Sequence, residues 1–146
     1  PPDRETLREV LERTTKNDFA LPSQVVDART ILAAQKLARR IPMAPEVKDW
    51  IVRLVLGTHP DGEFCAEDNR ELIRIGASPR ATINLTLAAR AVALLNGRTH
   101  VTADDVKYIA PDVLRHRLLL TYEAEAEGVN TDEIVTRVLE RVPLDR

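Results

Sequence analysis

The segment GASPRA at residues 76–81 has residue types and a spacing that suit anion chemistry, because it places an arginine in the first turn of an expected helix. Ser78 is a natural N-cap, Pro79 suits the first helical position, and Arg80 follows at the second. A helix N-terminus carries a partial positive charge of about half an elementary unit, so a cation there is unfavourable unless an anion is close. Free backbone N–H groups and a guanidinium together form a good phosphate receptor.

A structural interpretation of Arg80 is also open. Acidic residues precede the segment at Glu67, Asp68 and Glu71, and any of them could pair with the guanidinium. Ion pairs at helix ends are common and contribute little when they are exposed. Spacing alone therefore leaves both an anion site and an ordinary surface ion pair as interpretations of Arg80.

A second cationic cluster follows an expected helical turn and consists of Arg115, His116 and Arg117. One interpretation is a contact with another domain or with a neighbouring subunit. The other is a structural cluster in which the arginines pair with Asp104, Asp105 or Asp112. The residue types leave both interpretations open.

The sequence lacks the motifs of several kinds of active site. None of the five glycines is followed by lysine, so these residues contain no phosphate-cradling P-loop. The histidines His59, His100 and His116 lie far apart, and a single cysteine excludes a disulfide framework and a multi-cysteine zinc site. We therefore predict no metal site. Cys65 lies in an expected exposed loop, where a solvent-facing bystander is favoured over a catalytic thiol.

The composition is that of a globular domain with an aliphatic core. The 146 residues are 44% hydrophobic but only 3% aromatic, and the formal net charge is -2. This charge argues against a nucleic-acid partner. No apolar run approaches the ~20 residues of a membrane span and no signal peptide is present, so we predict a cytoplasmic protein without a membrane partner. The opening Pro1-Pro2-Asp3 indicates a piece of a longer protein.

Hydrophobic periodicity and capping residues predict an all-α fold, a compact helical bundle of six or seven helices with two or three very short strands. The expected helices cover approximately residues 5–15, 27–40, 45–58, 78–96, 102–110, 111–116 and 130–142. Residues 71–75 and 118–122 are expected to be extended, and residues 59–69 to form an exposed loop. The helix over 78–96 is apolar around its girth and should be the central, buried one, with Ala81, Leu85, Ala88, Val92 and Leu95 in one stripe.

Several ordered blocks resemble the C-terminal lid of the MoxR family of AAA+ ATPases. They are GASPRA at 76–81, AARA at 88–91, GR at 97–98, VTADDV at 101–106 and VLRHRL at 113–118. Upstream, VRL at 52–54 and THPDG at 58–62 also resemble the family, which often has arginine where His59 stands. The resemblance covers roughly residues 25–117.

This resemblance implies a role for each part of the chain. Arg80 would be the sensor-2 arginine, which reaches the γ-phosphate of ATP on the preceding α/β domain of the same or a neighbouring subunit. Ser78 and Pro79 would fix the helix start that aims it. Residues 1–16 would be the last helix of the AAA+ core or a hinge, and residues 17–146 the helical lid. The fragment alone would bind no cofactor and hydrolyse no ATP, whereas the full-length protein would use ATP and Mg.

The family also implies partners. Its members are homo-hexameric, chaperone-like ATPases that work with von Willebrand factor A domain proteins to mature metal cofactors in client enzymes. Two other functions are weighed against this one. The chain could be a helical protein-interaction module that does not respond to nucleotide, or a helix-turn-helix DNA binder built from residues 102–117, which the balanced charge opposes.

Overall fold

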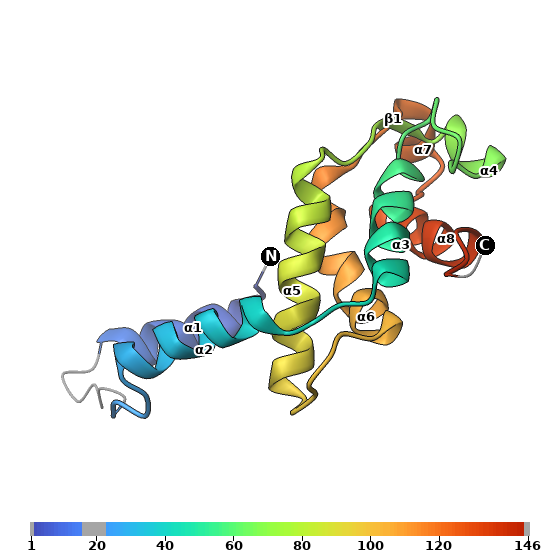
Figure 1. Cartoon of the computed structure of the whole chain (residues 1–146). Helices are drawn as coiled ribbons and strands as arrows, with labels where there is room; N and C mark the ends of the chain where they lie inside the picture. Colours follow the sequence, from blue (N-terminus) through green and yellow to red (C-terminus); the bar gives the residue numbers. More distant parts are fainter. Residues whose placement is uncertain (1, 16–22, 145–146) are drawn as a thin grey trace. The chain divides into compact units, whose positions relative to one another are not determined.

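The computed structural model describes residues 2–15 and 23–144 (Figure 1). Its contacts divide the chain into two units, Pro1–Ile31 and Leu32–Arg146. The described residues form eight α-helices, one 3-10 helix and two short strands, which confirms the predicted all-α class. The helices outnumber the predicted six or seven because α4 (Glu67–Arg70) and α7 (Tyr122–Ala126) are short helices where the sequence analysis expected none.

Two N-terminal helices begin at aspartate caps. The first unit contains α1 (Arg4–Thr15), where Asp3 Oδ1 accepts the Thr6 N–H at 2.8 Å. Hydrogen bonds from Thr6 hold the pKa of Asp3 below its ordinary value. The helix α2 (Ala28–Arg40) begins in the first unit and ends in the second, and Asp27 caps it as predicted, accepting the Thr30 N–H at 2.7 Å. Neither helix has a buried residue.

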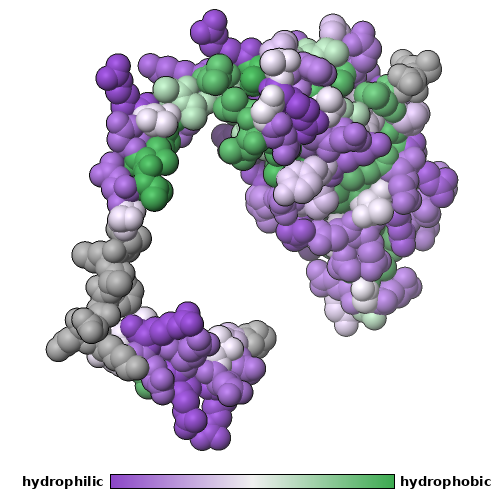
Figure 2. All heavy atoms as spheres, turned by 90° about the horizontal axis from the view of Figure 1, so that it is seen from below, coloured by the Kyte–Doolittle hydropathy of each residue, from purple (hydrophilic) through white to green (hydrophobic). Residues whose placement is uncertain are grey.

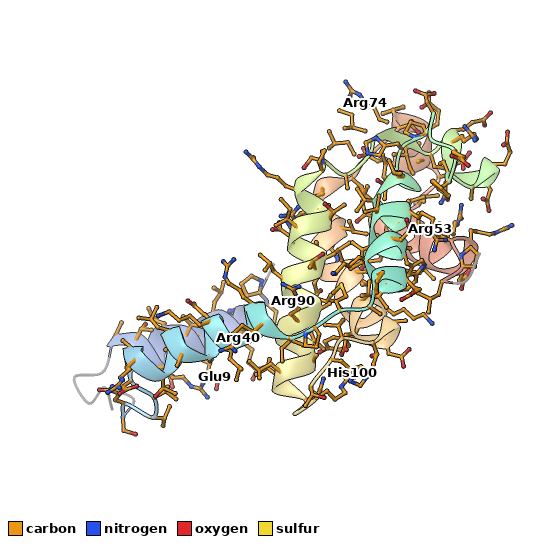
Figure 3. All side chains as sticks on the ribbon, in the orientation of Figure 1. Glu9, Arg40, Arg53, Arg74, Arg90 and His100 are labelled. Atoms are coloured by element: carbon orange, nitrogen blue, oxygen red, sulfur yellow. The ribbon has the colours of Figure 1, made fainter. Side chains whose placement is uncertain are left out.

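The helix α3 (Pro45–Leu56) starts at a proline, as predicted, and carries much of the core of the second unit. Trp50 is almost fully buried, and its indole N–H donates to the Val142 carbonyl at 2.7 Å. The Arg53 guanidinium is also buried and donates to the carbonyls of Pro143 at 2.6 Å and Leu144 at 2.9 Å (Figure 3). These bonds attach the C-terminal segment to α3.

The helix α5 (Arg80–Leu95) contacts both α3 and α6 (Ala103–Leu114), so it is the central helix, as predicted (Figure 1). Its buried stripe consists of Ala81, Leu85, Ala89 and Ala93, all with no exposed surface. The predicted stripe is wrong at Leu95, which is 86% exposed, because the buried face follows a strict four-residue spacing that leaves this residue on the other side.

A buried carboxylate organises the start of α6. Asp105 is almost fully buried, accepts the Thr102 N–H at 2.9 Å and forms an ion pair with Arg98. The predicted break at Pro111 is wrong, because α6 continues through this residue. Proline lacks the N–H that would bond the carbonyl of Lys107, so the helix continues with one hydrogen bond fewer.

The remaining elements close the second unit. Strand β1 (Ile73–Ile75) pairs antiparallel with β2 (Leu119–Leu120), which confirms the two expected extended segments. Between α6 and β2 lies the 3-10 helix η1 (Arg115–Arg117). The last helix, α8 (Thr131–Arg141), is capped by Asn130, as predicted, and packs against α6.

Hydrophilic side chains cover most of the second unit on the face shown in Figure 2, with apolar side chains visible between them. The largest exposed apolar side chains of this unit include Leu95, Tyr108 and Tyr122. Within the described part of the chain, each helix is too short or too polar to span a bilayer.

Cys65 is 7% exposed and belongs to the hydrophobic core, so the prediction of a solvent-facing bystander is wrong. The expected loop over residues 59–69 folds back onto the core and ends in α4, where Asn69 is also buried. Burial raises the pKa of the Cys65 thiol because the thiolate would lose its hydration. The side chain therefore packs as a small apolar group and is a weak nucleophile.

Replacing Leu85 with aspartate should unfold the domain, because it places an unpaired charge in the fully buried stripe of α5. We expect a loss of at least about 4 kcal/mol in the free energy of unfolding. The measurement is denaturant unfolding followed by circular dichroism. Ile83→Asp is the matched control, because Ile83 lies two residues away on the same helix and is 58% exposed. Equal stability of the two variants would contradict the placement of the core.

In the native protein, Cys65 should react with a disulfide reagent at a rate at least roughly tenfold lower than that of the same thiol in the unfolded chain at the same pH. The reason is that burial both blocks access and raises the thiol pKa. The absorbance of the released thiolate reports the rate, and the denatured protein supplies the reference. A native rate equal to the denatured rate would show that Cys65 is accessible.

Candidate functional site

Arg80 is the first residue of α5, and its side chain is exposed. Across residues 2–15 and 23–144, no hydrogen bond or ion pair engages its guanidinium. Two of the acidic residues considered as partners are directed elsewhere, since Glu67 lies 3.3 Å from Arg70 Nε and Asp68 lies 3.6 Å from Arg141, and the third, Glu71, forms no ion pair among the described residues. The surface ion pair that the sequence left open is therefore not formed by these residues.

The start of α5 differs from the predicted cap. Pro79 has helical backbone angles, φ -55° and ψ -22°, and the helix makes no side-chain capping bond. The Ser78 hydroxyl therefore does not serve as the N-cap acceptor that the sequence predicted. Its backbone carbonyl accepts the Ala81 N–H instead, at 2.8 Å, because the helical Pro79 closes a tight turn at this point.

Both sides of this exposed turn are anchored in the core. Ala77 and Ala81 are fully buried, whereas Ser78, Pro79 and Arg80 between them are exposed. The turn thus presents three consecutive side chains to solvent from a fixed base. Chemically, it combines a cation with the positive end of a 16-residue helix, an arrangement that suits an oxyanion such as phosphate.

The cluster Arg115, His116 and Arg117 forms the 3-10 helix η1. Arg115 Nε donates to Asp132 Oδ1 at 2.7 Å, and this bond raises the pKa of Arg115. The same guanidinium donates a second, longer bond of 3.3 Å to Asp112. Arg117 donates to the Val113 carbonyl at 2.6 Å and lies against the His116 ring.

The two arginines of η1 are thus held by their own domain. Arg115 pairs with Asp112, as the structural interpretation expected, and with Asp132, which the sequence did not indicate. Arg117 is held by the Val113 carbonyl. Asp105, another expected partner, is bonded to Arg98. The His116 side chain is exposed, as is that of Arg115, and its Nε2 faces the Arg117 guanidinium. The structure does not bring this cluster and Arg80 into one bonded network among the described residues.

Arg74 provides a useful comparison with Arg80. It lies on β1, six residues before Arg80, and its side chain is also exposed (Figure 3). Among the described residues it likewise forms no ion pair or hydrogen bond. It differs from Arg80 in its position, since it lies in a strand and not at a helix start.

No group of three or more histidine, cysteine or acidic residues that could hold a metal ion lies within the residues that the structure describes. The donor set at the start of α5 fits an anion, because it consists of a guanidinium, a hydroxyl and the N-terminal end of a helix. It offers no carboxylate ligand for Mg²⁺.

Comparison with known proteins places these features in context. A family described as AAA lid domain matches residues 65–138. Chaperone MoxR1 of Mycobacterium tuberculosis is 36% identical over 121 residues, which cover 83% of this chain and 32% of that protein. YeaC of Bacillus subtilis is 32% identical over 126 residues, which cover 84% of this chain and 36% of that protein. The chain thus spans about a third of the length of these curated relatives.

A solved structure agrees with this likeness. A crystal structure of a protein from Cytophaga hutchinsonii that is assigned as an ATPase superposes with a TM-score of 0.82 at 33% sequence identity. The likeness covers 98% of this chain and 44% of the other.

Proposed function

The chain belongs to the AAA lid domain family, as the helical lid of a MoxR-type AAA+ ATPase, and we propose that its Arg80 is the sensor-2 arginine of that ATPase. In this role the guanidinium contacts the γ-phosphate of ATP held by the AAA+ core of the same or a neighbouring subunit. The lid itself carries no Walker motif and hydrolyses no ATP alone.

One observation carries the proposal: Arg80 is exposed at the start of α5 and has no anionic partner among the described residues. A cation at the positive end of a helix is unfavourable until an anion approaches. A guanidinium held in advance stabilises the charge on a transferring phosphoryl group, because it needs no reorganisation when the reaction occurs.

Ser78 and Pro79 complete the nucleotide contact. Proline restricts its own backbone, so it keeps the residue before Arg80 in the conformation that begins the helix. The Ser78 hydroxyl makes no hydrogen bond to the described residues and lies two residues from Arg80, where it can donate to a phosphate oxygen.

The rest of the catalytic machinery belongs to the core. The Walker motifs, the sensor-1 residue and the arginine finger lie outside this chain, together with the site for ATP and Mg. Residues 1–16 belong to the end of the core or the hinge, and residues 17–146 to the lid. Of these, residues 1, 16–22 and 145–146 lie outside the described part of the chain. Nucleotide binding closes the lid onto the core, and hydrolysis releases it.

The full-length protein acts as a chaperone-like homo-hexamer in the cytoplasm, and uses ATP to remodel client enzymes or to mature their metal cofactors together with a von Willebrand factor A domain protein. The name of one relative, Chaperone MoxR1, supports the chaperone part. Another relative, 32% identical over 114 residues, is named as a magnesium-chelatase 38 kDa subunit from Chlorobaculum parvum, which supports the link to metal cofactors. The turn Arg115–Arg117, which includes His116, supplies an interdomain contact, because Arg115 and His116 are exposed there.

Arg80→Ala in the full-length ATPase should lower kcat by about 100-fold, because it removes a preorganised cation from the transferring phosphate. Steady-state ATP hydrolysis measures this effect. Thermal melting should be unchanged, since the side chain is exposed and unbonded among the described residues.

The matched control is Arg74→Ala, which removes an equally exposed arginine from β1 and should leave kcat unchanged. Unchanged turnover in Arg80→Ala would reject the sensor-2 role and favour a helical interaction module that does not respond to nucleotide. Equal losses in both variants would indicate a general effect of surface charge.

A further inference from the structure

The backbone of Ala77, three residues before Arg80, is held by the turn that follows α3. Thr58 Oγ1 accepts the Ala77 N–H at 2.9 Å and donates its own proton to the Val55 carbonyl at 2.6 Å. Thr58 and Ala77 are both fully buried. Because a buried N–H without an acceptor is costly, the threonine hydroxyl determines where Ala77 can lie.

The neighbouring residue, His59, holds the other polar group of Ala77. The Ala77 carbonyl lies 2.9 Å from His59 Nε2. A carbonyl oxygen can only accept a hydrogen bond, so Nε2 carries the proton and donates it. The backbone of His59 is itself fixed in a tight turn, in which the Gly62 N–H donates to the His59 carbonyl at 2.8 Å.

Gly76 shows how closely the two segments approach. A Cβ atom at this position would lie 2.6 Å from the Thr58 carbonyl oxygen and 2.9 Å from His59 Cγ. Any larger residue would therefore push the segments apart. The contact of Thr58 and His59, in the turn after α3, with residues 76–77 is thus tight as well as hydrogen-bonded.

This contact takes the place of a helix cap. The start of α5 has no side-chain capping bond, and first turns without caps fray readily. Ser78 and Pro79 are exposed, and the Ser78 side chain bonds to none of the described residues. The anchored Ala77 on one side and the buried Ala81 on the other are therefore what fix the base of Arg80.

We infer that Thr58 and His59 are positioning residues for Arg80: by fixing both polar groups of Ala77, they set the point from which the guanidinium reaches the nucleotide. This inference rests on the proposed sensor-2 role of Arg80. Neither residue touches the nucleotide in this scheme. Their effect on turnover passes entirely through Arg80, and this dependence can be measured.

The test is a double-mutant cycle in the full-length ATPase. Thr58→Val removes the hydroxyl with little change in shape, and His59→Phe removes the donor from a half-buried ring. Each should lower kcat roughly 10-fold, because a misplacement of about 1 Å can cost about 100-fold and each variant leaves the other bond to Ala77 in place. In an Arg80→Ala background neither should lower kcat further, because the residue that they position is gone.

Conservative variants and a distant threonine are the controls. Thr58→Ser and His59→Gln keep a hydroxyl and an N–H donor and should restore most of the turnover. Thr136→Val removes a threonine hydroxyl from α8, where it bonds the Asp132 carbonyl at 2.9 Å, and should leave turnover unchanged. All rates are measured well below the melting temperature of the least stable variant. If Thr58→Val does not fold, His59→Phe alone tests whether the bonds to Ala77 affect turnover through Arg80.

The outcomes separate this inference from the proposed function. Suppose that Arg80→Ala lowers kcat. If Thr58→Val and His59→Phe then leave kcat unchanged, or if they lower kcat by the same factor with and without Arg80, the positioning role is rejected and the sensor-2 role stands. If Arg80→Ala itself leaves kcat unchanged, the sensor-2 role fails, and the positioning role fails with it.

Discussion

The close packing of α5 against its neighbours is the constraint on which the second unit depends. Four side chains spaced four residues apart carry no exposed surface, and three of them are alanine. Small side chains on one face let neighbouring helices approach closely, and a larger side chain there would force them apart. Because α5 contacts both α3 and α6, its position also determines where its two ends lie. One end carries Arg80, and the other leads to Arg98.

Buried polar groups then attach the ends of the chain segments to this helical core. Trp50 and Arg53 bind successive backbone carbonyls after α8, and Asp105 joins Arg98 to the start of α6. Each hydrogen bond contributes only about 1 kcal/mol net, but loss of one partner leaves the other buried and unsatisfied at a larger cost. These bonds therefore specify the arrangement of the segments more than they add to its stability.

Local rules predicted the elements well and the contacts between them poorly. Asp27, Pro45 and Asn130 mark helix starts as expected, because capping depends on residues within a single turn. The sequence pattern wrongly predicts Cys65 at the surface, because its burial arises only when the segment after α3 folds back onto the core. The cap predicted at Ser78 is wrong because Pro79 takes helical backbone angles and the Ser78 carbonyl, not its hydroxyl, accepts the first N–H bond.

At the candidate site, residue types and spacing singled out Arg80 as a candidate, whereas they gave no such signal for Thr58 and His59. Their bonds to Ala77 join residues 19 and 18 positions apart. No helical or strand period relates residues at such separations, so only the tertiary structure reveals them. The family resemblance did include both residues, but only as members of a matching block.

The exposure of Arg80 explains how a lid with the proposed sensor-2 arginine responds to nucleotide. In the separate domain, water solvates the guanidinium, so the unpaired charge is tolerated. Closure onto the core would remove that water, and an unpaired cation in a dry interface is strongly unfavourable. A phosphate at the same place reverses the sign of this effect, because attraction between opposite charges grows as water leaves. A single unpaired arginine at the start of a rigid helix can thus oppose closure without nucleotide and favour it with nucleotide.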